Sequence, residues 1–336
     1  LCSMAVDALV ANKDEMAGEI CRQLGRPISA AGGEINGLED RARAMIGLAD
    51  EGLSPIRLAD KPGFERWIQR EPLGVVFVIA PWNYPYLTAV NAIMPAILAG
   101  NSVVLKHSAQ TPLCSERFHQ AFQAAGLPEG VFQYLHLSHN DTEDIVRDER
   151  VDYVAFTGSV SGGAMVEHAA AGRFIGVGLE LGGKDPAYVR ADAELSHAVE
   201  VTMDGAFFNS GQSCCGIERI YVHESVYDAY LQQAITWVNK LKLGRPDAQD
   251  TTLGPLVRTS AADFLRKQTQ EEIDQGAISH ISAEDFPLDK SGTPYLAPQL
   301  LSHVDHSKRV MTEESFGPVV CILKVHSDQE DNDLMN

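Results

Sequence analysis

The chain has 336 residues, which is more than one typical core accommodates and predicts two domains. Its hydrophobic content of 45 % and charged content of 22 % are typical of a folded protein. The formal net charge of −19 disfavours nucleic acids and anionic membranes as partners. No apolar run approaches the ~20 residues of a membrane-spanning helix, and the N-terminus carries no secretion-signal pattern.

The six cysteines show no spacing suited to zinc, so we expect no metal site. Cys214 and Cys215 are adjacent, and the other four lie far apart. A disulfide framework in so long a chain without a secretion signal would be unusual. We therefore expect a reducing, cytoplasmic compartment in which most of the thiols are buried and inert.

The first 21 residues form a helical pattern, with Met4, Leu9, Met16 and Ile20 on one apolar face. The weak, polar and proline-containing pattern of residues 54–72 suggests an arm that projects from the body. The chain starts inside a helical pattern and stops after a strand-like run at 319–325 without a closing element. We therefore expect it to be part of a longer protein.

Between these ends, strand and helix patterns alternate, which predicts an α/β fold with parallel sheets covered by helices. Expected strands are 75–80, 102–105, 131–135, 153–156, 186–189 and 219–223, with a further apolar strand that contains Glu180 and ends in a double glycine. Expected helices are 87–98, 115–125, 142–147, 161–170, 194–208, 226–241 and 261–276. Sheets of this kind bind ligands where strands end and helices begin.

Two segments carry residues suited to covalent catalysis. Residues 205–216, GAFFNSGQSCCG, place Cys214 in a Gly/Ser-rich turn whose backbone N–H groups can hold an oxyanion. GLELGGK places the carboxylate of Glu180 at the end of an apolar strand, where burial would raise its pKa toward that of a general base. Taken alone, each segment fits a structural role equally well: a pair of buried cysteines, and a glutamate paired with a lysine.

Three further segments suit a nucleotide or an oxyanion. FTGSVSGG places Gly158 and Ser159 at a helix start, where N–H groups suit a pyrophosphate, although such turns often contain Gly and Ser for steric reasons alone. Lys106 directly follows a strand and can meet ribose hydroxyls or a phosphate, or simply be solvated. Asn83 in APWNYP is fixed by prolines and can donate to an oxyanion, or close a turn.

The order PWNYP, LKHSAQTP, FTGS, LELGGK, GQSCC and EESFGP resembles the aldehyde dehydrogenase superfamily, from Cys2 to His326. The resemblance implies a Rossmann-like dinucleotide-binding domain (1–53 and 73–184), an oligomerisation arm (54–72) and a catalytic domain (185–336) that is incomplete at its C-terminal end. It also implies an aldehyde substrate, NAD or NADP as cofactor, and a homodimer or homotetramer.

The resemblance further implies a role for each matching residue. Cys214 is the nucleophile, Glu180 the general base of thioester hydrolysis, and Asn83 the side-chain donor of the oxyanion hole. The residues implied to contact the cofactor are Trp82, Lys106, Ser108, Ala109, Gly158, Ser159, Leu181, Glu314 and Phe316. Coenzyme-A-dependent members generally lack the glutamate, so its presence favours hydrolysis. Thr88 and Asn91 are expected at the aldehyde entrance and suggest a short or polar aldehyde.

Two departures from the family pattern concern the adenosine end of the cofactor. The lysine motif commonly reads K-P-S-E, whose glutamate holds the ribose hydroxyls of NAD, but here Ala109 occupies that position. Lys106 remains, with His107 and Ser108 as possible phosphate donors, so we expect NADP to be accepted at least comparably with NAD. The glycine-rich turn after the third strand is replaced by residues 135–138, LHLS.

Two other classes of protein remain open at this stage. A binding or structural protein that keeps the fold without turnover predicts loss of Cys214 or Glu180, and neither is lost. A thioester-forming hydrolase without redox chemistry would not require Lys106, Ser159 or Glu314.

Overall fold

The computed structural model describes residues 1–335, which divide into two compact units. The first unit comprises Leu1–Glu19 and Gly32–Leu181, and the second comprises Ile20–Ala31 and Gly182–Asn336. Residues 20–31, expected in the first domain, instead group with the second unit, because Ile28 N–H donates to the Pro246 carbonyl and Ser29 to that of Thr251.

The first unit contains a parallel five-stranded sheet in the order β5-β4-β3-β6-β7. Its strands are β3 (Val75–Ala80), β4 (Ser102–His107), β5 (Phe132–Tyr134), β6 (Tyr153–Thr157) and β7 (Gly176–Glu180). The chain proceeds outward from β3 to β5 and then returns to add β6 on the other side. The strand order therefore reverses between β3 and β6, which makes their carboxyl ends the switch point where doubly wound sheets bind ligands.

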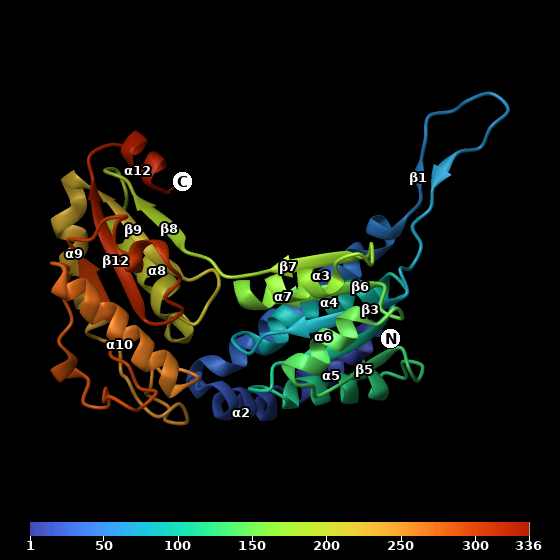
Figure 1. The fold of residues 1–336 in the computed structure, drawn as a ribbon, viewed down its shortest axis with the longest axis horizontal. Coiled ribbons are helices and arrows are strands. Elements are labelled where there is room, and N and C mark those ends of the chain that lie inside the picture. The colour runs from blue at the N-terminus through green and yellow to red at the C-terminus, as the bar shows by residue number, and fades with distance from the viewer. Residues whose placement is uncertain (336) are drawn as a thin grey trace. The chain divides into compact units, whose positions relative to one another are not determined.

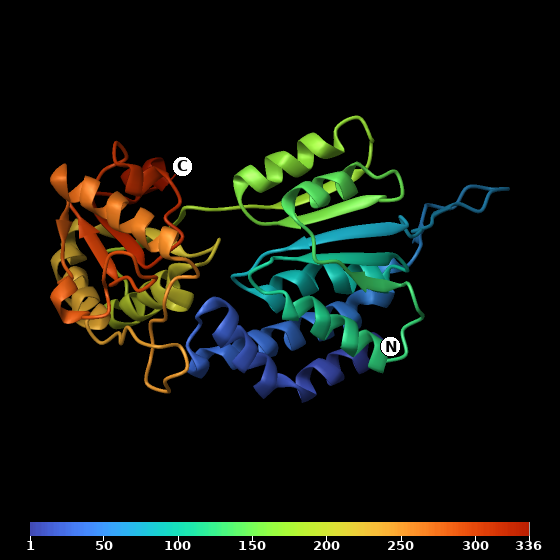
Figure 2. The ribbon, with the colours of Figure 1, turned by 60° about the horizontal axis from the view of Figure 1, so that its bottom comes forward.

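Helices cover both faces of this sheet (Figures 1 and 2). α6 (His139–Arg147) and α7 (Val160–Ala170) pack on one face, where Val146 and Val166 join a core with Phe77, Val154 and Phe156. α4 (Pro85–Leu98) and α5 (Leu113–Ala124) pack on the other face, with α1 (Cys2–Ala11) against α5. The β-branched and aromatic strand residues are thus buried from both sides, as parallel sheets require.

The N-terminal segment differs in part from the expectation. Its helical pattern breaks at Asn12 into α1 and α2 (Lys13–Leu24), followed by the 26-residue α3 (Ile28–Leu53). Leu9, Met16 and Ile20 are buried as predicted, but Met4 is exposed, so its assignment to the apolar face is wrong.

The proline-containing segment after α3 forms an antiparallel ribbon that projects from the body of the first unit (Figure 1). Its short strands are β1 (Ile56–Arg57) and β2 (Trp67–Ile68), and every residue from 51 to 73 is exposed.

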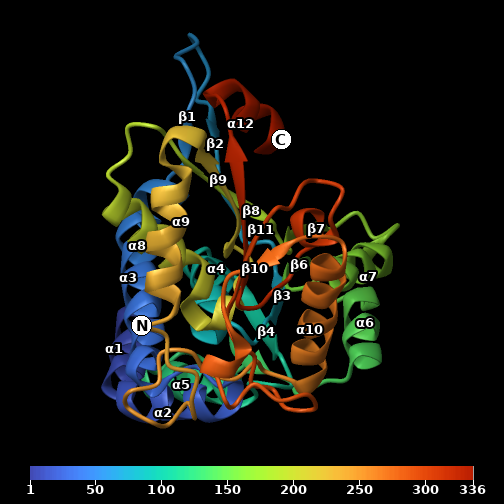
Figure 3. The same ribbon diagram turned by 90° about the vertical axis from the view of Figure 1, so that its left-hand side faces the viewer.

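The second unit contains a mixed sheet in the order β10-β11-β12-β9-β8. These strands are β10 (Ile278–Ser279), β11 (Gln299–Ser302), β12 (Val319–Val325), β9 (Ile217–His223) and β8 (Asp185–Val189), and only β10 pairs antiparallel. α8 (Leu195–Phe207) and α9 (Glu224–Val238) cover one face, and α10 (Thr259–Asp274) covers the other (Figure 3).

The α/β prediction is therefore confirmed, and the predicted strands and helices are all present within a few residues of their expected bounds. The sequence pattern did not reveal α3, β10, β11 or the short α11 (Arg309–Thr312). The last predicted strand is followed by α12 (Asp328–Met335), so the expectation that no further element follows it is wrong. Among the described residues no helix is long and apolar enough to cross a membrane.

Candidate active site

The candidate residues of the first unit lie at the carboxyl ends of its strands. Strand register aligns Ala80 with His107, and Ile79 with both Lys106 and Phe156. Because the strands are parallel, the segments that follow β3, β4, β6 and β7 emerge at one edge of the sheet. Nine of the candidate residues lie at this edge, at or just after the ends of these four strands: Trp82, Asn83, Lys106, Ser108, Ala109, Gly158, Ser159, Glu180 and Leu181.

Lys106 is the cation of this edge. Its side chain is 7 % exposed, and burial lowers the pKa of its ammonium group. Within residues 1–335 no carboxylate, carbonyl or hydroxyl accepts a hydrogen bond from it. The nitrogen is not among the buried atoms that lack a partner, so it still reaches solvent, and this position is suited to a ligand that brings hydroxyl or phosphate oxygens.

His107, which follows Lys106, has a structural role. Its ring is 2 % exposed, with Nε2 2.9 Å from the Pro85 carbonyl and Nδ1 3.0 Å from the Thr111 hydroxyl. Since a carbonyl only accepts, Nε2 carries the proton and Nδ1 accepts from Thr111. Burial lowers the pKa of His107 to about 4. The expectation that His107 donates to a phosphate is therefore wrong, because both ring nitrogens are used within the protein.

The PWNYP segment forms the start of α4, with Pro85 at its first position. Asn83 is 4 % exposed. The orphan N–H groups of Tyr86 and Leu87 donate to the carboxylate of Glu34 on α3, at 3.0 and 2.8 Å. Glu34 thus caps α4 and fixes the segment that carries Asn83.

Ser159 is the N-cap of α7, and its hydroxyl accepts from the N–H of Gly162 at 3.1 Å. The glycines around it leave room for neighbouring side chains: a Cβ at Gly158 would lie 2.7 Å from the ring of Phe156, and one at Gly163 would lie 2.5 Å from Leu181. Ser159 and Leu181 therefore both shape the start of α7.

Glu180 ends β7, and its backbone carbonyl accepts from Gly158 N–H at 2.9 Å. Its side chain is exposed. The expectation that this carboxylate is buried is therefore wrong, because β7 is an edge strand with no fully buried residue.

The second unit places Cys214 directly after a left-handed turn. Asn209, Ser210 and Gly211 have φ values of 55°, 57° and 68°, and the first two are strained for residues with a Cβ. Such strain persists only where surrounding contacts compensate for it, which is common at functional sites. Cys214 is half-buried, whereas Cys215 is exposed.

Buried polar groups hold this turn in place. The Arg26 guanidinium donates to the Asn209 amide oxygen at 2.9 Å, and the Ser210 hydroxyl donates to the Gly254 carbonyl at 2.9 Å. The Gln212 amide spans the turn, donating to the Asn209 carbonyl at 3.1 Å and accepting from Val257 N–H at 2.9 Å. Because these contacts come from distant parts of the sequence, the approach to Cys214 is rigid.

The double glycine of LELGGK, Gly182 and Gly183, packs closely against Cys214 and Glu314. A Cβ at Gly183 would overlap the carbonyl oxygen of Cys214, and one at Gly182 would overlap the carboxylate of Glu314. The N–H of Gly183 donates to that carboxylate at 3.1 Å. Within the second unit, the glycines of LELGGK therefore contact both the backbone of GQSCC and the Glu314 side chain of EESFGP.

The comparisons with known proteins agree with this arrangement. The profile of the "Aldehyde dehydrogenase family" matches residues 1–336. The chain belongs to the aldehyde dehydrogenase family. The Escherichia coli (strain K12) protein named succinate semialdehyde dehydrogenase NAD(P)+ Sad is 32 % identical over 319 residues, which cover 94 % of this chain and 67 % of that protein.

A Synechocystis protein named probable succinate-semialdehyde dehydrogenase NADP(+) is 32 % identical over 326 residues, covering 97 % of this chain and 71 % of its own length. A solved structure of succinic semialdehyde dehydrogenase from Streptococcus pyogenes, in complex with NADP+, is 26 % identical with a TM-score of 0.92. That superposition covers 99 % of this chain and 73 % of the other.

In this member of the aldehyde dehydrogenase family, the charges around Cys214 disfavour its thiolate. Burial raises the pKa of the Cys214 thiol, and Cys215, Glu314 and Asp185 raise it further. Burial also raises the pKa of Glu314. The resting thiol is therefore protonated at neutral pH and needs a base or an additional positive charge before it attacks.

Several residues that shape this site were missed from the sequence, among them Arg26, Glu34, Gln212, Lys184 and Glu218. The signal that could have found Glu218 is a glutamate inside a strand segment with Ile217, Ile220 and Tyr221, since charges there are rarely buried without a partner.

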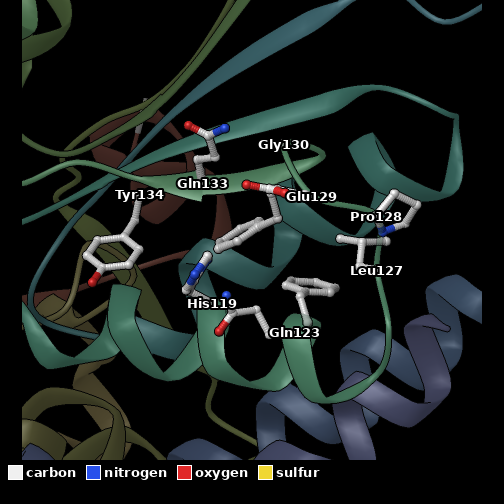
Figure 4. Close-up of a pocket in the computed structure, with 10 residues that line it drawn as sticks. His119, Gln123, Leu127, Pro128, Glu129, Gly130, Gln133 and Tyr134 are labelled. Atoms are coloured by element: carbon white, nitrogen blue, oxygen red, sulfur yellow. The ribbon is translucent and has the colours of Figure 1, made fainter.

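A cavity elsewhere in the first unit contains none of the candidate residues. It lies between α5 and β5, where His119, Gln123, Glu129 and Tyr134 surround the rings of Phe122 and Phe132 (Figure 4).

Proposed function

We propose that this chain oxidises an aldehyde to the carboxylic acid, with Cys214 as the nucleophile and NAD or NADP as the hydride acceptor. The observation that carries the proposal is the packing of Cys214 and Glu314 around Gly182 and Gly183. A half-buried thiol after a strained turn, beside a carboxylate that the resemblance assigns to the nicotinamide ribose, suits covalent catalysis with a dinucleotide.

In the proposed reaction, the sulfur of Cys214 adds to the aldehyde carbon while the Asn83 amide and the Cys214 N–H stabilise the alkoxide. Loss of one such donor typically costs on the order of 10²–10³ in rate. A bound NAD(P)+ would supply the acceptor for the hydride that this carbon loses, and Cys214 would then hold the acyl group as a thioester. Glu180 then removes a proton from water, the hydroxide displaces the sulfur, and the acid leaves. The sum is aldehyde, water and NAD(P)+ giving acid, NAD(P)H and a proton.

The cofactor proposal depends on the carboxyl edge of the first sheet. Lys106 is a largely buried residue whose ammonium has no acceptor among residues 1–335 and still reaches solvent, which fits ribose hydroxyls or a 2′-phosphate. Ala109 supplies no carboxylate to repel that phosphate. We therefore propose that NADP is accepted at least as well as NAD. The Streptococcus pyogenes relative in complex with NADP+ supports this proposal.

The proposed substrate is a short aldehyde with a polar or anionic end. Asn91 on α4 accepts a hydrogen bond from the guanidinium of Arg41 on α3 at 3.3 Å, and both side chains are exposed. This pair lies two helical turns beyond the PWNYP segment and offers a positive charge to a carboxylate. The succinate-semialdehyde dehydrogenases among the relatives act on such a compound by name.

The experiment is a panel of aldehydes tested with both cofactors, comparing the unmodified chain with the variants Cys214→Ser, Cys215→Ser and Arg41→Gln. Cys214→Ser should nearly abolish oxidation while the fold and cofactor binding persist, and Cys215→Ser should have little effect. Arg41→Gln should lower kcat/KM for succinic semialdehyde more than for butanal, because only the former carries a carboxylate. If Cys215→Ser is the inactive variant, the nucleophile has been assigned to the wrong thiol.

The exposed ribbon suggests how copies of the chain associate. It carries five exposed hydrophobic side chains, a density that isolated surface segments seldom show: Ile56, Leu58, Phe64, Trp67 and Ile68. We propose that the ribbon pairs with a second copy of the chain, as the resemblance implies for residues 54–72.

A further inference from the structure

A buried ion pair lies directly beneath the EESFGP loop in the second unit. The Lys184 ammonium contacts the Glu218 carboxylate, and their side chains are only 11 % and 4 % exposed. Lys184 is the last residue of LELGGK, and Glu218 is the second residue of β9, shortly after GQSCC. The pair therefore links the two motifs that carry the proposed base and nucleophile.

The Glu218 carboxylate also binds the backbone of the third motif. It accepts from the N–H of Ser315 at 2.8 Å and from the N–H of Phe316 at 2.9 Å. Lys184 reaches the same loop, because its ammonium lies 3.3 Å from the Ser315 hydroxyl. That hydroxyl in turn donates to the Gln268 amide oxygen at 3.1 Å. One carboxylate thus satisfies two buried N–H groups and an ammonium at once.

The loop that receives these contacts is strained. Phe316 has φ of +53°, a conformation that a residue with an aromatic side chain rarely adopts. Two N–H groups held by one anion fix the peptides on either side of Ser315, so the loop keeps this geometry without a glycine at that position. The two neighbours of Ser315 are Glu314 and Phe316, which the proposed function places at the ribose and ring of the nicotinamide.

We infer that Glu218, charged and held by Lys184, is the positioning residue that fixes Glu314 and Phe316 for the nicotinamide end of the cofactor. This inference rests on the proposed function, since only a nicotinamide cofactor gives that geometry a catalytic meaning. Glu218 itself touches no reacting atom. Its effect is transmitted through the backbone of residues 314–316, and a small misplacement of a reacting ring costs up to about 10²-fold in rate.

The test compares Glu218→Gln with Glu19→Gln. Glu19 is a matched control, because it is also a buried glutamate in an ion pair, with Arg117 on the first unit, far from these motifs in the sequence. Both variants lose a buried charge pair, so both should lower the thermal unfolding temperature. Only Glu218→Gln should raise the KM for NAD(P)+, by about tenfold or more.

The isotope effect on kcat distinguishes a positioning role of Glu218 from a general loss of stability. With an aldehyde deuterated at its carbonyl carbon, Glu218→Gln should show a larger isotope effect on kcat than the unmodified chain, because hydride transfer becomes slow. Glu19→Gln should leave both the cofactor KM and the isotope effect unchanged. Lys184→Gln keeps a donor to Glu218 but removes the charge, so it should change the cofactor KM and the isotope effect in the same direction by a smaller factor. This variant tests the inference if Glu218→Gln does not fold.

Three results would count against the inference. An unmodified chain that oxidises aldehydes, together with an unchanged cofactor KM and isotope effect in Glu218→Gln or Lys184→Gln, overturns it and leaves the proposed function intact. Equal changes in Glu19→Gln show that the effect is not specific to the loop. An unmodified chain that reduces no NAD(P)+ with any aldehyde overturns the proposed function and the inference together.

Discussion

His107 should make the stability of this chain depend on pH. The pKa of an unperturbed histidine is 6.5, and burial lowers that of His107 to about 4. Between these two values the unfolded chain binds a proton at this residue and the folded chain does not. The free energy of unfolding therefore falls as the pH is lowered through this window. Well below pH 4 the loss from this residue alone amounts to about 3 kcal/mol.

The free energy of unfolding is already lowered substantially at pH 5. At pH 5 almost every unfolded imidazole is protonated and few folded ones are, so the loss relative to pH 8 is about 2 kcal/mol. For a unit of this size, that lowers the melting temperature by about 4–8 °C. Glutamine at position 107 can keep both contacts, donating to the Pro85 carbonyl and accepting from Thr111, without titrating.

The assay is thermal unfolding at pH 8 and pH 5 for the unmodified chain and for His107→Gln. The difference between the two pH values should be smaller by about 4–8 °C in the variant. His168→Gln is the matched control, because His168 is exposed on α7 in the same unit and its loss should leave the pH dependence unchanged. An equal pH dependence in the unmodified chain and in His107→Gln would refute the assignment of a buried, neutral ring.

Three further predictions concern the proposed base, the cofactor and the ribbon. Glu180→Gln should slow steady-state turnover by about 10²–10⁴ and leave an acyl-enzyme detectable by mass spectrometry, whereas unchanged turnover would exclude Glu180 as the base. Ala109→Glu should shift kcat/KM from NADP toward NAD, and a strong NAD preference already present and unaltered by the glutamate would show that residue 109 does not set the choice. Trp67→Asp should lower the molar mass measured by light scattering, and an unchanged mass would show that the ribbon does not hold copies together.

The strands of both sheets were predictable because their apolar, β-branched runs are short and bounded by turns. β3 was predicted with its exact bounds, Val75–Ala80, since it is buried on both faces and flanked by Gly74 and Pro81. β11 (Gln299–Ser302) escaped prediction because it has only four residues, two of them polar, and becomes buried only through pairing with β12. Pairing of this kind is a property of the whole sheet and leaves little trace in a local sequence window.

The sequence predicted which residues belong to the candidate site better than it predicted their burial. The motif residues were identifiable through the resemblance, but their environments were not. Glu180 is exposed where an apolar strand suggested burial, and His107 is buried where it was expected to donate to a phosphate. Burial at the end of a strand depends on which helix packs over it. In the case of His107, the start of α4 supplies the Pro85 carbonyl that encloses the ring.

The glycines of the second unit explain why three short motifs can define one site. A Cβ at Gly211 would overlap the backbone of Gly317, just as one at Gly183 would overlap that of Cys214. These loops therefore pack main chain against main chain, which leaves no room for a side chain and little room for movement. Because such contacts depend on the absence of a Cβ at particular positions, the motif is short and specific. The helices around it pack through side chains of many shapes, so no comparable pattern marks them. A thiol held in this way has a fixed direction of approach, and its reactivity then depends on the charges that surround it.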